Sequence, residues 1–369
     1  MSKPRIIMLM PWVFSVESVY GDRLRFLSEF YCGSLYVLSN EWGEEKIGEF
    51  HVLKIKGGNN LIRMVFSILA DIRKSRVEGN PFSLIMSYDP LKVGIVAALV
   101  ARICDLKFIV EINGVFTSPY NYVDMENKCI ATIKRHLFPA IEGMVIRAAD
   151  GVKLLYPRQI DYFRLKFTFD KKIVRSFPDY TNVSRFKNLS SANEILFAGY
   201  PFYRKGLDVL IDAFKVVSNE FPDWTLKIIG WFPDKKNIEN YIGGHPRINL
   251  HPPVDYKEMP QHVGSTGILV LPSRSEGMGR VLLEAMACEK PRIGSNIEGI
   301  PTVLEHNKDG LLVEPGSVEE LVMALRLLMG SPGLRRELGG AGKIRLDREF
   351  TEAAYFSKLI DFYNEVLAA

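Results

Sequence analysis

The chain has 369 residues, of which 47% are hydrophobic and 24% charged, and its formal net charge is +4. At roughly 100–200 residues per domain, this length indicates about two domains, and the composition is typical of a globular protein with sizeable cores. The mild charge and the lack of a dense basic tract argue against nucleic acid as a partner, but they are compatible with an anionic small molecule or a membrane surface.

The first half of the sequence alternates short apolar runs with longer amphipathic ones. The run RIIMLM is interpreted as a buried first strand rather than part of a signal peptide, because no A-x-A-like cleavage site follows it. The longest apolar run, 93–101, is far shorter than the ~20 residues that a membrane span requires. Hydrophobic periodicity predicts strands at 5–10, 35–39, 51–56, 82–88 and 107–112, and helices at 22–30, 61–76 and 91–105.

A polar stretch at 177–192 (FPDYTNVSRFKNLSSA) interrupts this pattern and is predicted to be an interdomain linker. A second series follows, with strands at 194–200, 224–232, 267–273, 291–295 and 310–315 and helices at 206–221, 280–289 and 318–330. Alternating strands and helices predict an α/β protein with two doubly wound domains, whose ligands bind beyond the carboxyl ends of the strands. A cleft between the two domains is the default site.

The stretch SRSEGMGRVLLEAMACEKP, at 273–291, joins a predicted strand to a predicted helix. Gly277, Met278 and Gly279 lie in the crossing loop, where backbone N–H groups and a helix N-terminus favour an anion such as phosphate. Glu284 then lies about 7–8 Å along the helix, a suitable distance for gripping a diol, while Glu276 on the loop can reach hydroxyls on the other side. The pattern predicts a nucleotide sugar, although a solvated helix glutamate and a turn residue remain an alternative reading of the two acids.

A second loop of this kind occurs in GYPFYRKGLDVLIDAF, which follows a strand ending near Gly199. Arg204 and Lys205 lie just before the next helix, where they are suited to neutralise the charge of a departing diphosphate. The alternative is that both side chains are simply solvated.

These two stretches, with NIEGIPTVLEHNKDGLLVEPGSVEELVMAL at 296–325, resemble the donor domain of GT-B retaining glycosyltransferases of the large family-four (glycosyl transferases group 1) class. The resemblance covers roughly 195–328 and implies a GT-B fold: two doubly wound Rossmann-like domains facing a central cleft. It implies an N-terminal acceptor-binding domain at 1–185, a C-terminal donor-binding domain at 186–349, and a last helix, 350–369, that crosses back to the first domain.

The resemblance also implies roles for individual residues. Glu284 would bind the nucleotide ribose and Glu276 the hydroxyls of the donor sugar, while Lys205 would hold the diphosphate beside the amides of Gly277–Gly279. The expected reaction moves a sugar from a UDP- or GDP-sugar to an acceptor hydroxyl on a glycan or lipid-linked glycan, with retention, by front-face substitution. Neither a cofactor nor a metal is expected.

The sequence departs from the family pattern at several positions. Tyr200 stands where the family often has Arg, so either Arg204 supplies that charge or no residue does, and Thr302 stands where Glu is common. On the acceptor side, the family's His before a Gly is replaced by Asn113 before Gly114; with Glu111 these residues end a predicted strand and are expected either to face the cleft or to form a structural turn.

Other classes of protein fit less well. The sequence has no D-x-D pair, no G-x-S-x-G, no C-x-x-C and no strand followed by G-x-G-x-x-G, and LGGAGK at 338–343 follows a helix rather than a strand. The alternatives left open are a nucleotide-sugar epimerase or phosphorylase on the same scaffold, and a catalytically inactive partner subunit.

The stretch 134–155 carries basic residues beside apolar ones. It is interpreted either as a contact with an anionic membrane surface or as a helix with a solvated basic face. Because the four cysteines are scattered, we expect a cytoplasmic protein, with peripheral association at the inner face of the membrane as the further expectation. The expected setting is the assembly of bacterial-type polysaccharides or glycolipids.

Overall fold

The computed structural model describes residues 3–14, 19–57, 60–123, 125, 127–164, 172–232 and 235–369. These residues form two compact units, which we describe separately. The first unit comprises 1–113, 134–180 and 352–369, and the second comprises 114–133 and 181–351. Residues 114–133, which lie in the expected first domain, therefore group with the second unit.

The first unit is built on an eight-stranded sheet with the order β3-β4-β2-β1-β5-β6-β7-β8. All pairs are parallel except β3 with β4, which forms an antiparallel edge. The strands are β1 (Arg5–Met10), β2 (Cys32–Ser39), β3 (Gly43–Ile47), β4 (Phe50–Lys56), β5 (Phe82–Ser87), β6 (Lys107–Ile112), β7 (Gly151–Leu154) and β8 (Ile173–Ser176). The prediction of a buried first strand is confirmed, because five of the six residues of β1 are fully buried.

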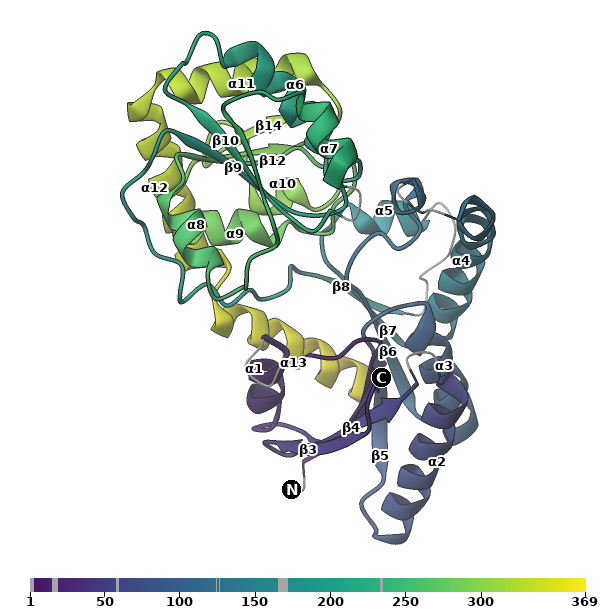
Figure 1. The fold of residues 1–369 in the computed structure, drawn as a ribbon. Coiled ribbons are helices and arrows are strands. Elements are labelled where there is room, and N and C mark those ends of the chain that lie inside the picture. Colours follow the sequence, from purple (N-terminus) through teal and green to yellow (C-terminus); the bar gives the residue numbers. More distant parts are fainter. Residues whose placement is uncertain are drawn as a thin grey trace. The chain divides into compact units, whose positions relative to one another are not determined.

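Helices cover both faces of this sheet, as the alternating pattern predicts (Figure 1). The helices α1 (Val19–Leu27) and α13 (Glu352–Ala368) lie on one face, where α13 contacts β6 and β8. The helices α2 (Leu61–Val77), α3 (Lys92–Cys104) and α4 (Lys128–Ala148) lie on the other. The short α5 (Gln159–Arg164) follows β7, and the 3-10 turn η1 (Pro119–Tyr122) precedes α4.

The second unit contains a six-stranded parallel sheet with the order β11-β10-β9-β12-β13-β14. In chain order this is 3-2-1-4-5-6, the order of the dinucleotide-binding Rossmann fold. The strands are β9 (Glu194–Ala198), β10 (Thr225–Ile229), β11 (Ile248–His251), β12 (Ile268–Leu271), β13 (Arg292–Ser295) and β14 (Leu311–Val313). The order reverses between β9 and β12, so these two neighbouring strands define the switch point of the sheet.

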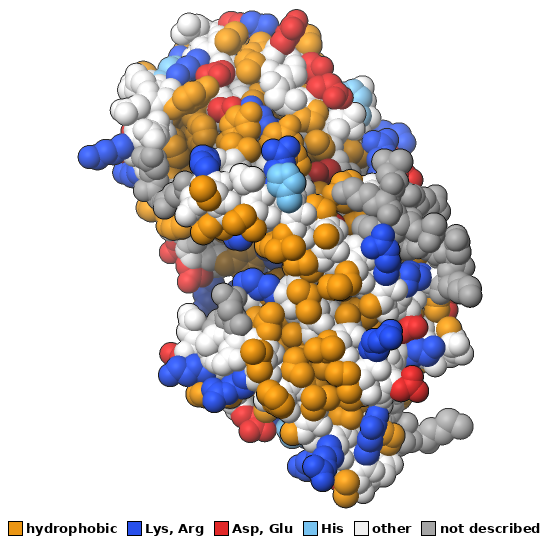
Figure 2. All heavy atoms as spheres, turned by 90° about the vertical axis from the view of Figure 1, so that its right-hand side faces the viewer, with side chains coloured by type: hydrophobic (Ala, Val, Ile, Leu, Met, Phe, Trp, Pro, Cys, Tyr) orange, Lys and Arg blue, Asp and Glu red, His pale blue; other side chains and the backbone are white. Residues whose placement is uncertain are grey.

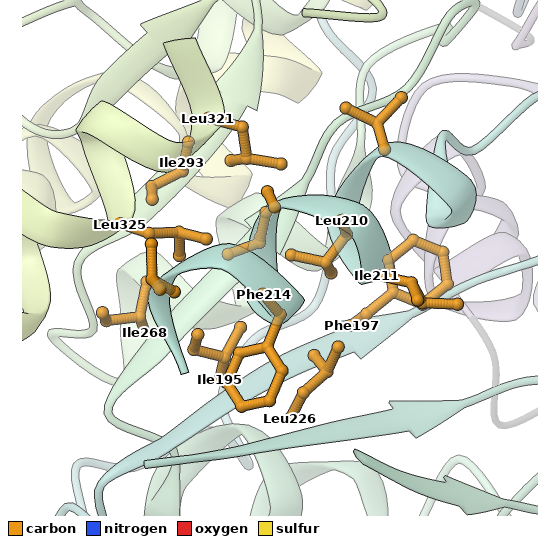
Figure 3. Close-up of a cluster of buried hydrophobic side chains, with 14 of the residues drawn as sticks. Ile195, Phe197, Leu210, Ile211, Phe214, Leu226, Ile268, Ile293, Leu321 and Leu325 are labelled. Carbon is orange, nitrogen blue, oxygen red and sulfur yellow. The ribbon is translucent and has the colours of Figure 1, made fainter. Parts of the chain in front are cut away.

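The core of the second unit forms where helices pack on the sheet. Figure 3 shows Ile195, Phe197, Leu226, Ile268 and Ile293 of the strands beneath Leu210 and Phe214 of α6 (Leu207–Val217) and Leu321 and Leu325 of α11 (Val318–Gly330). The other helices are α7 (Lys235–Ile242), α8 (Met259–Ser265), α9 (Arg280–Ala287), α10 (Ile300–Val303) and α12 (Pro332–Glu349).

The stretch predicted to be an interdomain linker, 177–192, lies between β8 and β9. Neither a helix nor a strand occurs between β8 and β9, a stretch that the structure describes in full. Among the helices within the described residues, none combines the length and the hydrophobicity that a membrane span needs.

Candidate active site

The predicted phosphate loops meet at the switch point of the second sheet. One loop joins β9 to α6 and the other joins β12 to α9, and both leave the carboxyl ends of their strands. Each helix starts after a glycine in the left-handed conformation, Gly206 at φ 68° and Gly279 at φ 75°, and neither cap residue has a side chain to bond the first N–H groups. Two helix starts that lack a side-chain cap at this edge are suited to bind an anion.

The two loops are in direct contact. A Cβ atom on Gly206 would lie 1.9 Å from the carbonyl oxygen of Pro272, so only glycine fits at this position. The N–H of Arg274 donates to the carbonyl of Arg204 at 2.8 Å. The backbone of one loop thus fixes the position of the other.

An ion pair joins the two loops between Lys205 Nζ and Glu276 Oε2. Both side chains are largely buried, with exposed fractions of 14% and 12%. Burial disfavours the ionised form of Glu276, but Lys205, Arg204 and the N–H of Gly277 outweigh it and hold the pKa of the carboxylate below its usual value. The aliphatic part of Lys205 lies over Gly199, where a Cβ would be 3.5 Å from Cγ of the lysine. The structure therefore brings together Lys205, Glu276 and Gly199, as the motifs predict.

Glu284 lies on the second turn of α9 and is 6% exposed. The hydroxyl of Tyr256 donates to its Oε1 at 3.1 Å. Burial raises the pKa of Glu284, and the hydrogen bond from Tyr256 and the charge of Arg280 oppose that shift. Glu284 is thus a largely buried acid whose desolvation is only partly offset by its neighbours, and the alternative of a solvated surface glutamate is ruled out.

A third glutamate, Glu298, was missed by the motif analysis. It follows the carboxyl end of β13, and its carboxylate accepts hydrogen bonds from the hydroxyl of Ser275 at 3.0 Å and from the N–H of Glu276 at 2.5 Å. Burial raises the pKa of Glu298 to about 7, and the charge of Glu276 adds to the shift. Its position after a strand end, three residues beyond Ser295, is the feature by which the sequence could have indicated it.

A second cross-loop pair stiffens the same region. Arg274 donates from both terminal nitrogens to the carboxylate of Asp208, at 2.7 Å each, and its guanidinium lies 4.0 Å from the ring centre of Tyr203. Arg204 differs: it is half-buried, and within the described part of the chain its guanidinium donates to the carbonyl of Tyr200, at 3.3 Å. The ring of Tyr200 packs edge-on against Trp231 at 4.9 Å. The predicted charge-neutralising role of Arg204 stays a prediction.

The remaining predicted residues take up different positions. The side chain of Met278 is buried among the apolar residues beneath α9, so only its backbone is available to a ligand. Thr302 lies in α10, where its carbonyl accepts a hydrogen bond from Arg345 at 2.7 Å. Within the part of the chain that the structure describes, no group of three His, Cys, Asp or Glu side chains is arranged to hold a metal ion.

The acceptor-side residues are not brought together as a set. Glu111 is fully buried in the first unit, where Arg23 donates to both of its oxygens and Tyr363 donates to Oε1 at 3.1 Å. Asn113 donates to the carbonyl of Tyr88 at 3.5 Å, and Gly114 groups with the second unit. The carboxylate of Glu111 therefore faces the interior of its own unit rather than an acceptor.

Two Rossmann-like units, the second with an ion pair that joins two loops at its switch point, are the architecture of the GT-B fold. Residues 181–345 match the family model described as glycosyl transferases group 1.

Individual relatives agree with this assignment. An uncharacterized glycosyltransferase from Haemophilus influenzae is 26% identical over 262 residues, 70% of each chain. Several other relatives are matched over less than half of their own length. Among solved structures, the chain is similar to sucrose-phosphate synthase from Thermosynechococcus elongatus, with a TM-score of 0.79 and 18% identity over 99% of each chain. HepE from Anabaena, solved in complex with UDP-glucose, covers 99% of this chain and 100% of its own with a TM-score of 0.72 at 13% identity. At these identities the solved structures establish the fold alone.

Proposed function

We propose that this chain transfers a sugar from a nucleoside diphosphate sugar to an acceptor hydroxyl, with retention of the anomeric configuration and without a metal. The observation that carries the proposal is the Lys205–Glu276 pair at the switch point, flanked by the starts of α6 and α9. A cation, two helix N-termini and a nearby carboxylate supply what a sugar diphosphate needs in one place.

The diphosphate would lie against Lys205 and the Gly277–Gly279 amides. When bound, the diphosphate would also accept hydrogen bonds from the ammonium of Lys205, which pairs with Glu276 in the structure. The carboxylate of Glu276 would then have acceptor positions available for sugar hydroxyls. Because its pKa is held low, Glu276 stays ionised and acts as an acceptor throughout the neutral range. Arg204, which is half-buried and whose charge acts on Glu276, would add a second positive charge.

Glu284 would bind the two hydroxyls of the nucleotide ribose. It lies five residues after Gly279, which corresponds to about 7–8 Å along α9 and suits the separation between a diphosphate and its ribose. Tyr256 holds one carboxylate oxygen and so orients the other. UDP is the first nucleotide to test, because HepE is similar in fold and was solved with UDP-glucose; GDP is the second.

In the reaction, the bond between the anomeric carbon and the phosphate oxygen breaks, and the acceptor oxygen bonds to the same face of the sugar. The acceptor proton passes to the leaving diphosphate, whose developing charge Lys205 and the helix N-termini stabilise. The acceptor would be a hydroxyl of a glycan or lipid-linked glycan in polysaccharide or glycolipid assembly, and Asn113 and Gly114 stay the candidates for its recognition.

A thermal-shift panel tests this proposal. UDP, GDP, ADP and their common sugar conjugates are added to the native chain, to Glu284→Ala and to Glu319→Ala, a control at an exposed glutamate of α11. A nucleotide at 100 times its dissociation constant adds about 2.7 kcal/mol of stability. We expect one base to stabilise the native chain and the control, and Glu284→Ala to lose most of the shift. If no nucleotide shifts the native chain, the partner-subunit alternative replaces the transferase.

A further inference from the structure

The helices α2, α3 and α4 of the first unit expose apolar side chains on their outward faces. On α2, Ile62, Phe66 and Val77 are 73%, 68% and 84% exposed, and their spacing places them on one side of the helix. On α3, Leu99 and Ile103 are four residues apart and exposed. The outward face of a surface helix is ordinarily polar, so these side chains need an explanation.

The same stripe continues on α4, where Leu137 and Met144 are 51% and 52% exposed. Contacts between the helices join the three stripes into one surface. Arg76 of α2 donates to the carbonyl of Cys104 of α3 at 2.7 Å. Gly94 of α3 lies so close to α4 that a Cβ there would be 3.0 Å from Val145. Figure 2 shows hydrophobic side chains gathered on the lower part of the molecule, with Lys and Arg side chains along their edges.

The charges on this surface are almost all positive. Together α2, α3 and residues 134–148 carry nine Lys and Arg against two acidic residues, a net charge of +7, whereas the whole chain carries +4, so all other residues sum to −3. Both acids turn inward. Asp71 accepts hydrogen bonds from the hydroxyls of Ser34 and Tyr36 at 2.8 and 2.7 Å, and Glu142 is 1% exposed. The first exposed carboxylates come at the helix ends, Glu78 and Asp105.

An aromatic residue extends this pattern beyond the helices. Trp42 is 54% exposed, and the guanidinium of Arg63 on α2 lies 4.8 Å from its ring centre. A Trp with one apolar ring and one N–H donor is suited to the boundary between water and lipid. We call the outward surface of α2, α3 and residues 134–148, together with Trp42, the basic-apolar face.

We propose that the basic-apolar face docks the chain on the surface of an anionic lipid bilayer. Apolar side chains would enter the boundary between headgroups and acyl chains, and the surrounding Lys and Arg would meet the negative headgroups. A protein partner with a hydrophobic patch would match the apolar residues but would not explain the excess of Lys and Arg on the three helices, which outweighs the exposed Glu41 and Glu44 beside Trp42. The sequence expectation of a contact through 134–155 is thereby changed: residues 151–154 form the buried strand β7, and α2 and α3 supply most of the surface.

Co-sedimentation with large unilamellar vesicles tests this proposal on the full chain. One set of vesicles is pure phosphatidylcholine, and the other contains about one-third phosphatidylglycerol. We expect binding to the anionic vesicles that weakens as salt is raised. Phe66→Ser with Leu99→Ser should lower the affinity at least about tenfold by removing apolar contacts. Arg73→Gln with Arg102→Gln should lower it about 25-fold, at about fivefold for each charge.

The control is Met323→Ser with Leu327→Ser on α11, which removes two side chains of similar exposure from the second unit and should leave vesicle binding unchanged. Circular dichroism melts exclude variants that do not fold. The proposal is overturned if the native chain ignores anionic vesicles, if it binds both kinds of vesicle equally, or if the control loses as much affinity as the variants. A concentration-dependent dimer that Phe66→Ser with Leu99→Ser abolishes would instead assign the face to a second copy of the chain. No nucleotide enters this test, so its outcome is independent of the donor site.

Discussion

Replacing Gly206 by Ala should destabilise the second unit much more than the same replacement at another glycine in the left-handed conformation. The residue has φ 68°, which costs an L-residue about 1–2 kcal/mol, partly offset by about 0.4–1 kcal/mol from a less flexible unfolded chain. In addition, its Cβ would lie 1.9 Å from the carbonyl oxygen of Pro272, so α6 or the β12–α9 loop must move. Overpacking of this kind costs about 1–3 kcal/mol. We expect a total loss of about 3 kcal/mol.

Gly244 provides the matched control. It lies in the same unit at φ 69°, and a Cβ there meets nothing within 4 Å, so Gly244→Ala should cost only about 1 kcal/mol. The free energy of unfolding is measured in urea for both variants and the native chain. The difference of about 2 kcal/mol between the variants reports the contact between the two site loops. If both variants lose the same amount, the close approach of Gly206 to Pro272 is not a constraint on the site.

Three further changes test the electrostatics of the site. Burial raises the pKa of Glu298 from 4.5 to about 7, so the folded protein loses stability as the pH rises from about 4.5 to 7 and the carboxyl group ionises. In Glu298→Gln, the free energy of unfolding in urea should change less with pH across that window than it does in the native chain. Lysine cannot form the two parallel hydrogen bonds that Arg274 donates to Asp208, so Arg274→Lys should lower the free energy of unfolding by about 1–2 kcal/mol in the same assay. An unchanged urea midpoint would show that this pair does not stabilise the protein. Tyr256→Phe should weaken nucleotide binding about fivefold in calorimetry, because it removes the hydrogen bond to Glu284. If the variant and the native chain bind the nucleotide equally well, that hydrogen bond does not contribute to ligand binding.

The parts of the site that lie next to each other in sequence could be predicted from it. Lys205 and Glu276 each follow a predicted strand and precede a predicted helix, and the carboxyl ends of neighbouring parallel strands meet at one edge. Their pairing, however, depends on the strand order: β9 and β12 are neighbours in the sheet, although 69 residues lie between the end of β9 and the start of β12. The sequence pattern contains no information on such a crossover, and the same is true of the contact between Arg274 and Asp208.

Other elements were missed because their sequence patterns are weak. The strands β7 and β8 have four residues each, too few to show a period. The helix α12 buries only Leu338, Gly339, Gly342 and Leu346, so it lacks an apolar stripe. Its stretch LGGAGK lies inside this helix, whereas we expected it to follow one. A Cβ on Gly339 would lie 2.0 Å from the carbonyl oxygen of Glu289, so this glycine serves close packing rather than phosphate binding.

Glu111 shows how a polar residue at a strand end can mislead. Its position predicts a ligand contact, but two tyrosines of α13, Tyr355 and Tyr363, arrive from the far end of the chain and enclose the Arg23–Glu111 pair. The buried cluster explains the acid structurally, since a buried charge needs a partner and hydrogen bonds. Only the tertiary structure, in which α13 packs on the first sheet, distinguishes the two roles.

The most direct test of the donor site compares a nucleoside diphosphate with its nucleoside by calorimetry, in the native chain and in Lys205→Met. Lys235→Met, at an exposed lysine of α7, is the control, and nucleoside affinity reports whether each variant is folded. We expect the diphosphate to bind about 100-fold more tightly than the nucleoside in the native chain and in the control. We expect Lys205→Met to lose most of that difference while keeping its affinity for the nucleoside. Equal affinities for the two ligands in the native chain, or an unchanged difference in Lys205→Met, would contradict a diphosphate site at the switch point.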